Sequence, residues 1–140
     1  MKAPKIFFSL CISTILTSHA FAESIAVIVH PSNPLMDVSK DDIKRIFLSK
    51  TDSIKKVKLK PITQNSLQPI RIKFDEDVLG KSPSKSKAYW SRLIFTAAGM
   101  PPPELNSNGE IIKWVSENPD AIAYIEESSL NDSVKLLKKF

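Results

Sequence analysis

The segment that most constrains the fold is an apolar run of mainly β-branched residues near the start of the chain. It spans Ile25–His30, and Pro31, Asn33 and Pro34 end it at once. A run in which nearly every residue is apolar, rather than every second one, is typical of a strand covered on both faces, as in a parallel sheet. The sequence therefore predicts a central strand that is buried on both sides.

Strand-like and helix-like segments alternate after this run. Strands are predicted for Val57–Ile62, 121–125 and 134–137, and a loop for 49–56. Helices are predicted after the capping pattern Ser39-x-x-Asp42, from Ser66 to about Leu79, from Lys85 to about Ala98 with Ser84 as cap, and after Ser107-x-x-Glu110. Pro69 fits the second helix only within its first turn. This order predicts one α/β domain with some parallel strand pairing.

The first 22 residues have the composition of a secretory signal peptide. Lys2 and Lys5 precede the apolar segment Ile6–Leu16, and Ala20-Phe21-Ala22 matches the small-residue pattern for cleavage. The apolar segment is shorter than the ~20 residues that span a bilayer. We therefore predict cleavage after Ala22, a periplasmic domain of residues 23–140, and no membrane span in the mature chain.

The mature chain offers few groups for catalysis or metal binding. Without residues 1–22 the net charge falls from +5 to +3, Cys11 is lost and His30 is the one histidine. A catalytic triad needs a base that titrates near pH 7, and zinc needs three or four ligands, which His30 alone does not supply. The acidic run Asp75-Glu76-Asp77 is predicted to lie on a solvated helix face. We expect no enzyme activity, no metal or cofactor, and no nucleic-acid partner.

The most distinctive candidate site is the polar turn Thr63-Gln64-Asn65-Ser66. It follows a predicted strand and precedes a predicted helix, and ligands of α/β sheets bind beyond the carboxyl ends of strands. The start of a helix offers free backbone N–H groups, and Arg71 lies about one turn inward, so these residues are a candidate cradle for a small anion. The alternative is that Ser66 is an ordinary N-cap and Arg71 forms a surface ion pair.

Five segments follow one another in an order that is found in a known family. They are IAVIVHPSN (25–33), VSKDDIKRIFLSK (38–50), VKLKPITQNS (57–66), AYWSRLIFTAAGMPPPE (88–104) and NPDAIAYIEESSL (118–130). In these segments the chain resembles the short phosphate-type substrate-binding proteins linked to ABC transporters. The resemblance implies a single lobe of the type 2 periplasmic binding-protein fold, with a mixed sheet flanked by helices.

The resemblance leaves two functions open. The first is an exported, non-catalytic solute-binding protein that works with an ABC transporter permease and binds a small oxyanion such as phosphate through Thr63, Gln64, Asn65, Ser66 and Arg71. However, Gln64 stands where the family has an arginine, and Asn65-Ser66-Leu67 replaces its Ser-Gly-Thr turn. The chain also resembles only about half of a two-lobed protein. The second function is therefore a lobe that binds an envelope protein, such as a membrane sensor, without binding a solute.

Overall fold

A buried central strand organises the sheet. The computed structural model describes residues 23–140, so the predicted signal peptide lies outside the described residues. The predicted central strand is confirmed as β1 (Ile25–Val29), in which every residue is fully buried. It lies between β7 (Ala121–Glu126) and β8 (Lys135–Lys139) and is antiparallel to both, so the inference of parallel neighbours was wrong for this strand. A continuous apolar run predicts burial on both faces of a strand, but it does not predict whether the neighbouring strands are parallel or antiparallel to it.

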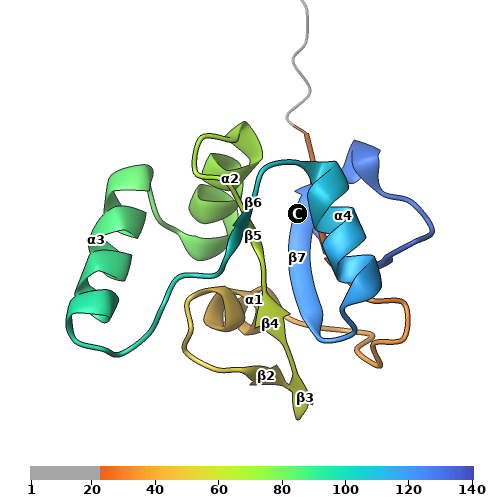
Figure 1. The fold of residues 1–140 in the computed structure, drawn as a ribbon, viewed down its shortest axis with the longest axis horizontal. Coiled ribbons are helices and arrows are strands. Elements are labelled where there is room, and N and C mark those ends of the chain that lie inside the picture. The colour runs from red at the N-terminus through yellow and green to blue at the C-terminus, as the bar shows by residue number, and fades with distance from the viewer. Residues whose placement is uncertain (1–22) are drawn as a thin grey trace, which may run out of the picture.

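The sheet is mixed, as predicted, because β4 (Lys60–Pro61) runs parallel to β7 at the outer edge. The strand order is β4-β7-β1-β8. Helix α1 (Lys40–Phe47), helix α2 (Pro69–Phe74) and the π-helix η1 (Asp75–Leu79) that continues α2 cover one face of this sheet. Helix α4 (Asn108–Glu117) covers the other face, and Figure 1 shows it packed against β7.

Two hydrophobic clusters fill the spaces between these layers, and both are formed within residues 23–140. The larger cluster contains Val27, Phe47, Phe74 and Tyr124, and the rings of Phe74 and Tyr124 stack with their centroids 3.8 Å apart. The smaller cluster lies under α4 and contains Ile28, Ile111, Val115 and Ile125. Alternate residues of β1 enter opposite clusters, which is why a strand with no polar position is stable here.

Local capping signals place two helices correctly. The Ser39 hydroxyl accepts a hydrogen bond from the Asp42 N–H, and the Asp42 carboxylate accepts one from the Ser39 N–H, both at 3.0 Å. Ser107 caps α4 in the same way, by accepting from the Glu110 N–H at 3.1 Å. The Glu110 carboxylate accepts from the N–H of Asn106 rather than from that of the N-cap Ser107, so the return hydrogen bond goes to the residue before the cap.

The predicted strand Val57–Ile62 is divided, and the loop before it was misread. Residues 53–54 form β2 (Ser53–Ile54), which pairs with β3 (Val57–Lys58) in a hairpin. After β4, the first half of the predicted turn is a further short strand, β5 (Thr63–Gln64), which pairs in parallel with β6 (Glu104–Leu105). Strands of two residues carry too little periodicity to be recognised in a sequence.

Two helix starts also differ from the prediction. Helix α2 begins at Pro69 rather than after Ser66, with the proline in its first turn as expected, and Gly80 at φ 68° ends η1. Helix α3 (Pro83–Phe95) is capped by Ser82 and not by Ser84. Proline is favoured at the first helical position, so the Ser82-Pro83 pair outcompetes the later serine.

Helix α3 stands apart from the sheet at the left of Figure 1. Its buried residues are Ser86 and Trp90, and Trp90 joins the larger cluster. The short 3₁₀ helix η2 (Glu127–Ser129) follows β7. None of the helices in residues 23–140 is long and apolar enough to cross a bilayer.

The hairpin between β2 and β3 yields a stability prediction. Lys55 and Lys56 form its two-residue turn, with φ values of 49° and 69°. Such turns favour Asn and Gly, because a side chain costs about 1 kcal/mol or more in this left-handed region. We expect Lys56→Gly to stabilise the chain by about 1 kcal/mol, and so to raise the melting temperature measured by circular dichroism by roughly 4 °C.

Lys58→Gly is the matched control, because it removes the same side chain from an extended position in β3. Glycine weakens strands, so this variant should lower the melting temperature. A lower melting temperature for Lys56→Gly as well would show that the turn does not hold Lys56 in the left-handed region.

Candidate functional site

The first two residues of the predicted polar turn are buried in the protein. Thr63 and Gln64 are 4% and 1% exposed. The Thr63 hydroxyl forms a 2.6 Å hydrogen bond with the Tyr124 hydroxyl, which also accepts from the Gln64 N–H at 3.3 Å. The side-chain amide of Gln64 donates to Asn108 Oδ1 at 2.7 Å and to the Tyr124 carbonyl at 3.4 Å. The Thr63 side chain therefore points toward Tyr124 in the larger cluster, and the Gln64 side chain points toward the start of α4.

The second half of the turn lies at the surface, but the backbone and side-chain groups of Asn65 are bonded within the chain. The Asn65 side chain accepts a hydrogen bond from the Leu67 N–H at 2.9 Å and donates to Asn106 Oδ1 at 3.1 Å. The Asn65 carbonyl accepts from the Gln68 N–H, and Pro69, the first residue of α2, has no N–H. The start of α2 therefore offers fewer free amides than the sequence suggested. Ser66 is exposed and is not the N-cap.

Arg71 closes this region with three hydrogen bonds. Its Nε donates to Asp75 Oδ2 at 3.0 Å, and its Nη1 donates to the Gln64 carbonyl at 2.8 Å and to Glu104 Oε1 at 3.1 Å. The Arg71 side chain is only 11% exposed and that of Asp75 only 9%. The ion pair is thus buried, not superficial, and the prediction that Asp75 faces solvent was wrong. Asp75 also accepts from the Ser86 hydroxyl of α3 at 3.2 Å, so this pair links α2 and η1 to α3.

Burial and ion pairing act in opposite directions on these groups. Burial is the largest single influence on Arg71 and opposes its charge, but the charge of Asp75 and the hydrogen bonds to Asp75 and Glu104 act together to raise the pKa of the guanidinium. Burial also raises the pKa of the Asp75 carboxyl, by more than Arg71 lowers it. Burial above all raises the pKa of Tyr124 and keeps its hydroxyl protonated. The cation of Arg71 is therefore shared between two carboxylates and a carbonyl.

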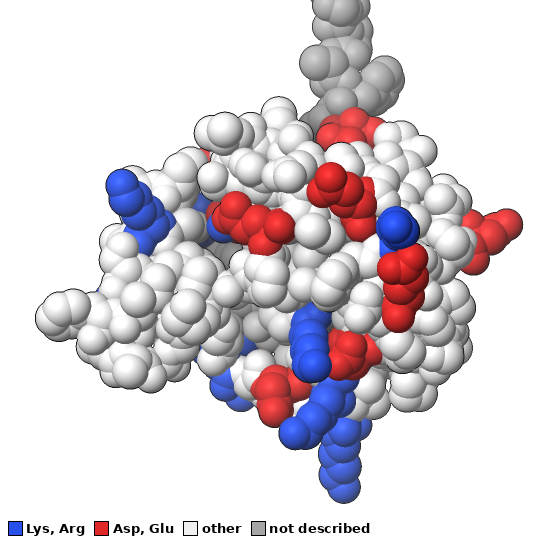
Figure 2. Space-filling model, viewed as in Figure 1, with Lys and Arg blue, Asp and Glu red and all other residues white. Residues whose placement is uncertain are grey.

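The surface around the turn is acidic rather than basic. Figure 2 shows acidic side chains over β6 and α4 on this face, whereas basic side chains gather at its lower end near β3. Ser66 and Arg71 do share a hollow of about 350 Å³, which Lys87 and Ser86 of α3 also line. Asp75 lies in the same wall. The structure thus brings two of the five predicted contact residues, Ser66 and Arg71, to one hollow, with Asn65 at the surface nearby and Thr63 and Gln64 buried.

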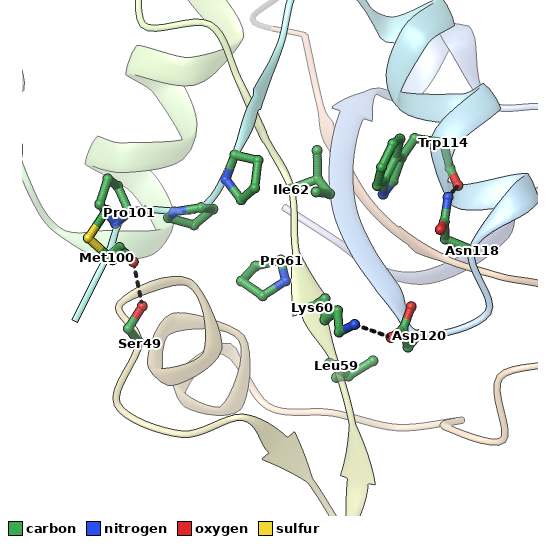
Figure 3. A pocket seen from close by; sticks show the side chains of 12 residues that line it. Ser49, Leu59, Lys60, Pro61, Ile62, Met100, Pro101, Trp114, Asn118 and Asp120 are labelled. Atoms are coloured by element: carbon green, nitrogen blue, oxygen red, sulfur yellow. Dashed lines mark hydrogen bonds and ion pairs between the residues drawn. The ribbon is translucent and has the colours of Figure 1, made fainter.

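A different hollow, which we call the β4 hollow, lies beside the edge strand β4 and has a volume of about 380 Å³. Its apolar lining consists of Leu59, Pro61, Ile62, Met100, Pro101, Pro102, Pro103 and Trp114, and its polar rim of Ser49, Lys60, Asn118 and Asp120. Figure 3 shows Trp114 of α4 on one side of the strand and Met100 with Pro101 on the other. A hydrogen bond from Ser49 Oγ to the Met100 carbonyl (3.1 Å) and an ion pair between Lys60 and Asp120 (3.3 Å) fix the rim.

The sequence did not reveal the β4 hollow because its walls come from segments far apart in the chain. The run Met100-Pro101-Pro102-Pro103 reads simply as a stiff connector. The available signal was Trp114, a large aromatic residue that flanks the buried stripe of α4 and stays 43% exposed. Met100 is 69% exposed. Large apolar side chains that line an open hollow mark a binding surface more often than scattered ones do.

His30 follows β1 and has a local role. Its Nδ1 accepts a hydrogen bond from the Ser32 N–H at 3.0 Å and shares one with the Ser32 hydroxyl at 2.7 Å. Within residues 23–140, no three His, Asp or Glu side chains are grouped so that they could hold a metal ion.

Comparison with known proteins places this architecture. No protein-family model matches the chain, and no curated protein matches it. Among solved structures, an ABC-type phosphate transport receptor from Vibrio cholerae is similar over 83% of this chain and 46% of its own length, with a TM-score of 0.64 and 20% identity. A putative phosphate ABC transporter substrate-binding protein from Clostridium perfringens, solved with bound phosphate, is similar over 83% of this chain and 44% of its own length, with a TM-score of 0.64 and 22% identity. PstS from Borrelia burgdorferi is similar over 82% of this chain and 46% of its own length, with a TM-score of 0.62 and 16% identity.

These similarities establish a fold. The chain spans less than half the length of the binding proteins that it matches, and the identities are low. The predicted resemblance and the predicted α/β class with a mixed sheet are both confirmed. The chain has the fold of about half, one lobe, of a phosphate-type ABC transporter substrate-binding protein.

Proposed function

We propose that this chain is an exported, non-catalytic lobe that binds another protein of the cell envelope through the β4 hollow. The observation that carries the proposal is an apolar, solvent-open hollow with rigid walls, in which Trp114 and Met100 are left partly exposed. Exposed aromatic and methionine side chains are enriched where proteins bind one another. The signal-peptide pattern of residues 1–22 and the similarity to periplasmic binding proteins support the location.

The chemistry of the hollow indicates how the partner binds. Pro61 belongs to the edge strand β4 and has no N–H to donate. A partner strand therefore lacks a donor at this edge, and addition of a strand to the sheet is disfavoured. The walls of proline, Ile62 and Trp114 instead suit one or two apolar side chains of the partner that insert between them.

The polar turn favours a lobe that binds a protein over a lobe that carries a solute. An oxyanion arriving at Arg71 would meet Glu104 and Asp75, which already neutralise the guanidinium. It would also have to replace hydrogen bonds that are made within the chain.

Site-specific photo-crosslinking tests the proposal in the producing cell. A photoreactive phenylalanine analogue placed at Trp114 should yield one discrete cross-linked product in the envelope fraction. The same analogue at Lys113, an exposed neighbour outside the lining of the hollow, is the matched control and should yield none. The proposal fails if position 114 yields no product, or if position 113 yields the same one.

Oxyanion binding is a second candidate function. The phosphate-bound structure from Clostridium perfringens has a similar fold, and Ser66, Arg71 and Lys87 line one hollow here. Of the contacts predicted from the sequence (Thr63, Gln64, Asn65, Ser66 and Arg71), Ser66 and Arg71 are the two that line this hollow. It predicts saturable heat of binding when inorganic phosphate is titrated into the wild-type chain by calorimetry, and loss of that heat in Ser66→Ala.

A further inference from the structure

A cluster of cations lies where α1 and α3 approach each other, beside residues of α3 that do not line the hollow of Arg71. Its members are Lys44, Lys50, Lys81, Lys85 and Arg92, and we call them the cation cluster. None of the five forms an ion pair within 4.0 Å with any residue of the described range 23–140. Their charges act together on Lys81. Cations that gather without an ion-pair partner repel one another, so the surface favours a negatively charged ligand.

The cluster surrounds a shaped surface. Lys81, Lys85 and Arg92 line a shallow hollow of about 350 Å³ with Ala88 and Tyr89. Lys81 Nζ lies 4.5 Å from the centre of the Tyr89 ring, and the Tyr89 hydroxyl donates to the Leu48 carbonyl at 2.7 Å, which fixes the ring. Burial, and then the four neighbouring cations, lower the pKa of Lys81. A bound anion would relieve this repulsion.

The same helix carries exposed apolar side chains beyond the cations. Phe95 is 93% exposed and Ile94 50% exposed at the end of α3. Phe95 lies three residues after Arg92, so the two side chains are neighbours on the helix surface. The helix stands apart from the sheet in Figure 1, which leaves this end accessible. Basic and large apolar groups are therefore presented side by side by one protruding element.

The composition of the surface favours a lipid over a protein ligand. Four of the five cations are lysines, and lysine is depleted in protein–protein interfaces. Lysine-rich surfaces beside exposed aromatic residues are typical of proteins that attach to anionic membranes, where the cations contact headgroups and the apolar groups enter the interface. Asp41, Glu76 and Asp77 share a neighbouring hollow with Lys44 and bound the surface there.

We propose that the cation cluster and Phe95 form a contact surface for an anionic phospholipid membrane. Phosphate groups of the lipid lie against Lys81, Lys85 and Arg92, and the Phe95 ring enters the headgroup region. This attachment is independent of the partner protein proposed for the β4 hollow.

Vesicle sedimentation tests the proposal with the chain that begins at Glu23, which contains both hydrophobic clusters. The chain should sediment with vesicles of phosphatidylglycerol and phosphatidylcholine at low salt and not with vesicles of phosphatidylcholine alone. The double variant Lys85→Gln/Arg92→Gln should bind about 25-fold more weakly, because each basic residue near an anionic surface contributes a factor of about five. Phe95→Ser should weaken the binding that persists at higher salt.

The variant Lys58→Gln/Lys113→Gln is the matched control, since it removes the same charge from exposed positions outside the cluster. It should bind as the wild type does, and circular dichroism should show all variants folded. Failure to sediment with anionic vesicles overturns the proposal, and so does an equal loss in the control variant. Release of the chain by 10 mM inorganic phosphate at constant ionic strength would indicate a free-phosphate site instead. A dimer that Phe95→Ser dissociates would indicate contact with a second copy.

Discussion

Replacement of Arg71 by methionine is expected to lower the free energy of unfolding by about 3 kcal/mol. The substitution leaves the buried carboxylate of Asp75 without its cation and the Gln64 carbonyl without its donor. Removing one partner of a buried ion pair costs roughly 3–5 kcal/mol, because the other charge stays buried and uncompensated. Urea unfolding followed by circular dichroism measures this loss, and the melting temperature should fall by about 10 °C.

Two further variants show whether the pair is the cause. Arg45→Met removes an exposed arginine from α1 and should change stability by less than about 0.5 kcal/mol. Arg71→Met/Asp75→Leu replaces both charges with apolar groups and should recover at least half of the loss. A loss below about 1 kcal/mol for Arg71→Met, or no recovery in the double variant, would mean that Arg71 is not held between carboxylates.

Gln64→Glu is expected to be comparably destabilising, by about 3 kcal/mol at pH 7. The side-chain amide of Gln64 donates to two acceptors, Asn108 Oδ1 and the Tyr124 carbonyl, and the residue is 1% exposed. A carboxylate there would face acceptors only, and a buried charge without a donor is costly. Burial would raise the pKa of the introduced carboxyl above its unfolded value of about 4.3.

This substitution therefore has a pH signature with a defined sign. Because the folded chain binds the proton more tightly than the unfolded chain, the destabilisation is largest above the folded pKa and shrinks as the pH falls toward about 4.3. Gln68→Glu is the control, since Gln68 lies at the partly exposed start of α2, where a negative charge is favourable. Unfolding curves for both variants between pH 4 and 8 measure the difference. Equal, pH-independent stabilities would contradict the buried position of Gln64.

Features that depend on local chemistry could be predicted from the sequence. The burial of β1 follows from five successive apolar residues, and the start of α1 follows from Ser39 and Asp42, which bond within one turn. Strand direction was not predictable, because an apolar run has the same composition in either orientation. The resemblance to one lobe of a binding protein depended on whole segments in order, and it is confirmed at the level of the fold.

The chemistry of the candidate site depended on distant residues and was therefore beyond local patterns. Thr63 read as part of a polar turn, but its hydroxyl bonds to Tyr124, which lies 61 residues further along. Arg71 was predicted to contact an anion or to form a surface ion pair, but Glu104, 33 residues further along, shares its charge with the buried Asp75. Whether a polar residue at a strand end can bind a ligand depends on whether distant residues already bond to it. Sequence spacing does not reveal those residues.

The closed state of the polar turn is the feature that most clearly separates a partner-binding lobe from a solute carrier. Its direct test is a titration of the chain that begins at Glu23 with inorganic phosphate up to 10 mM at constant ionic strength. NMR would follow the Arg71 Nε–H and the Gln64 side-chain amide, and calorimetry the melting temperature. If the turn is closed, neither NMR signal moves and the melting temperature stays constant. Saturable shifts of both signals, with stabilisation that reaches about 2.7 kcal/mol at a hundred times Kd, would contradict a closed turn and establish an oxyanion site.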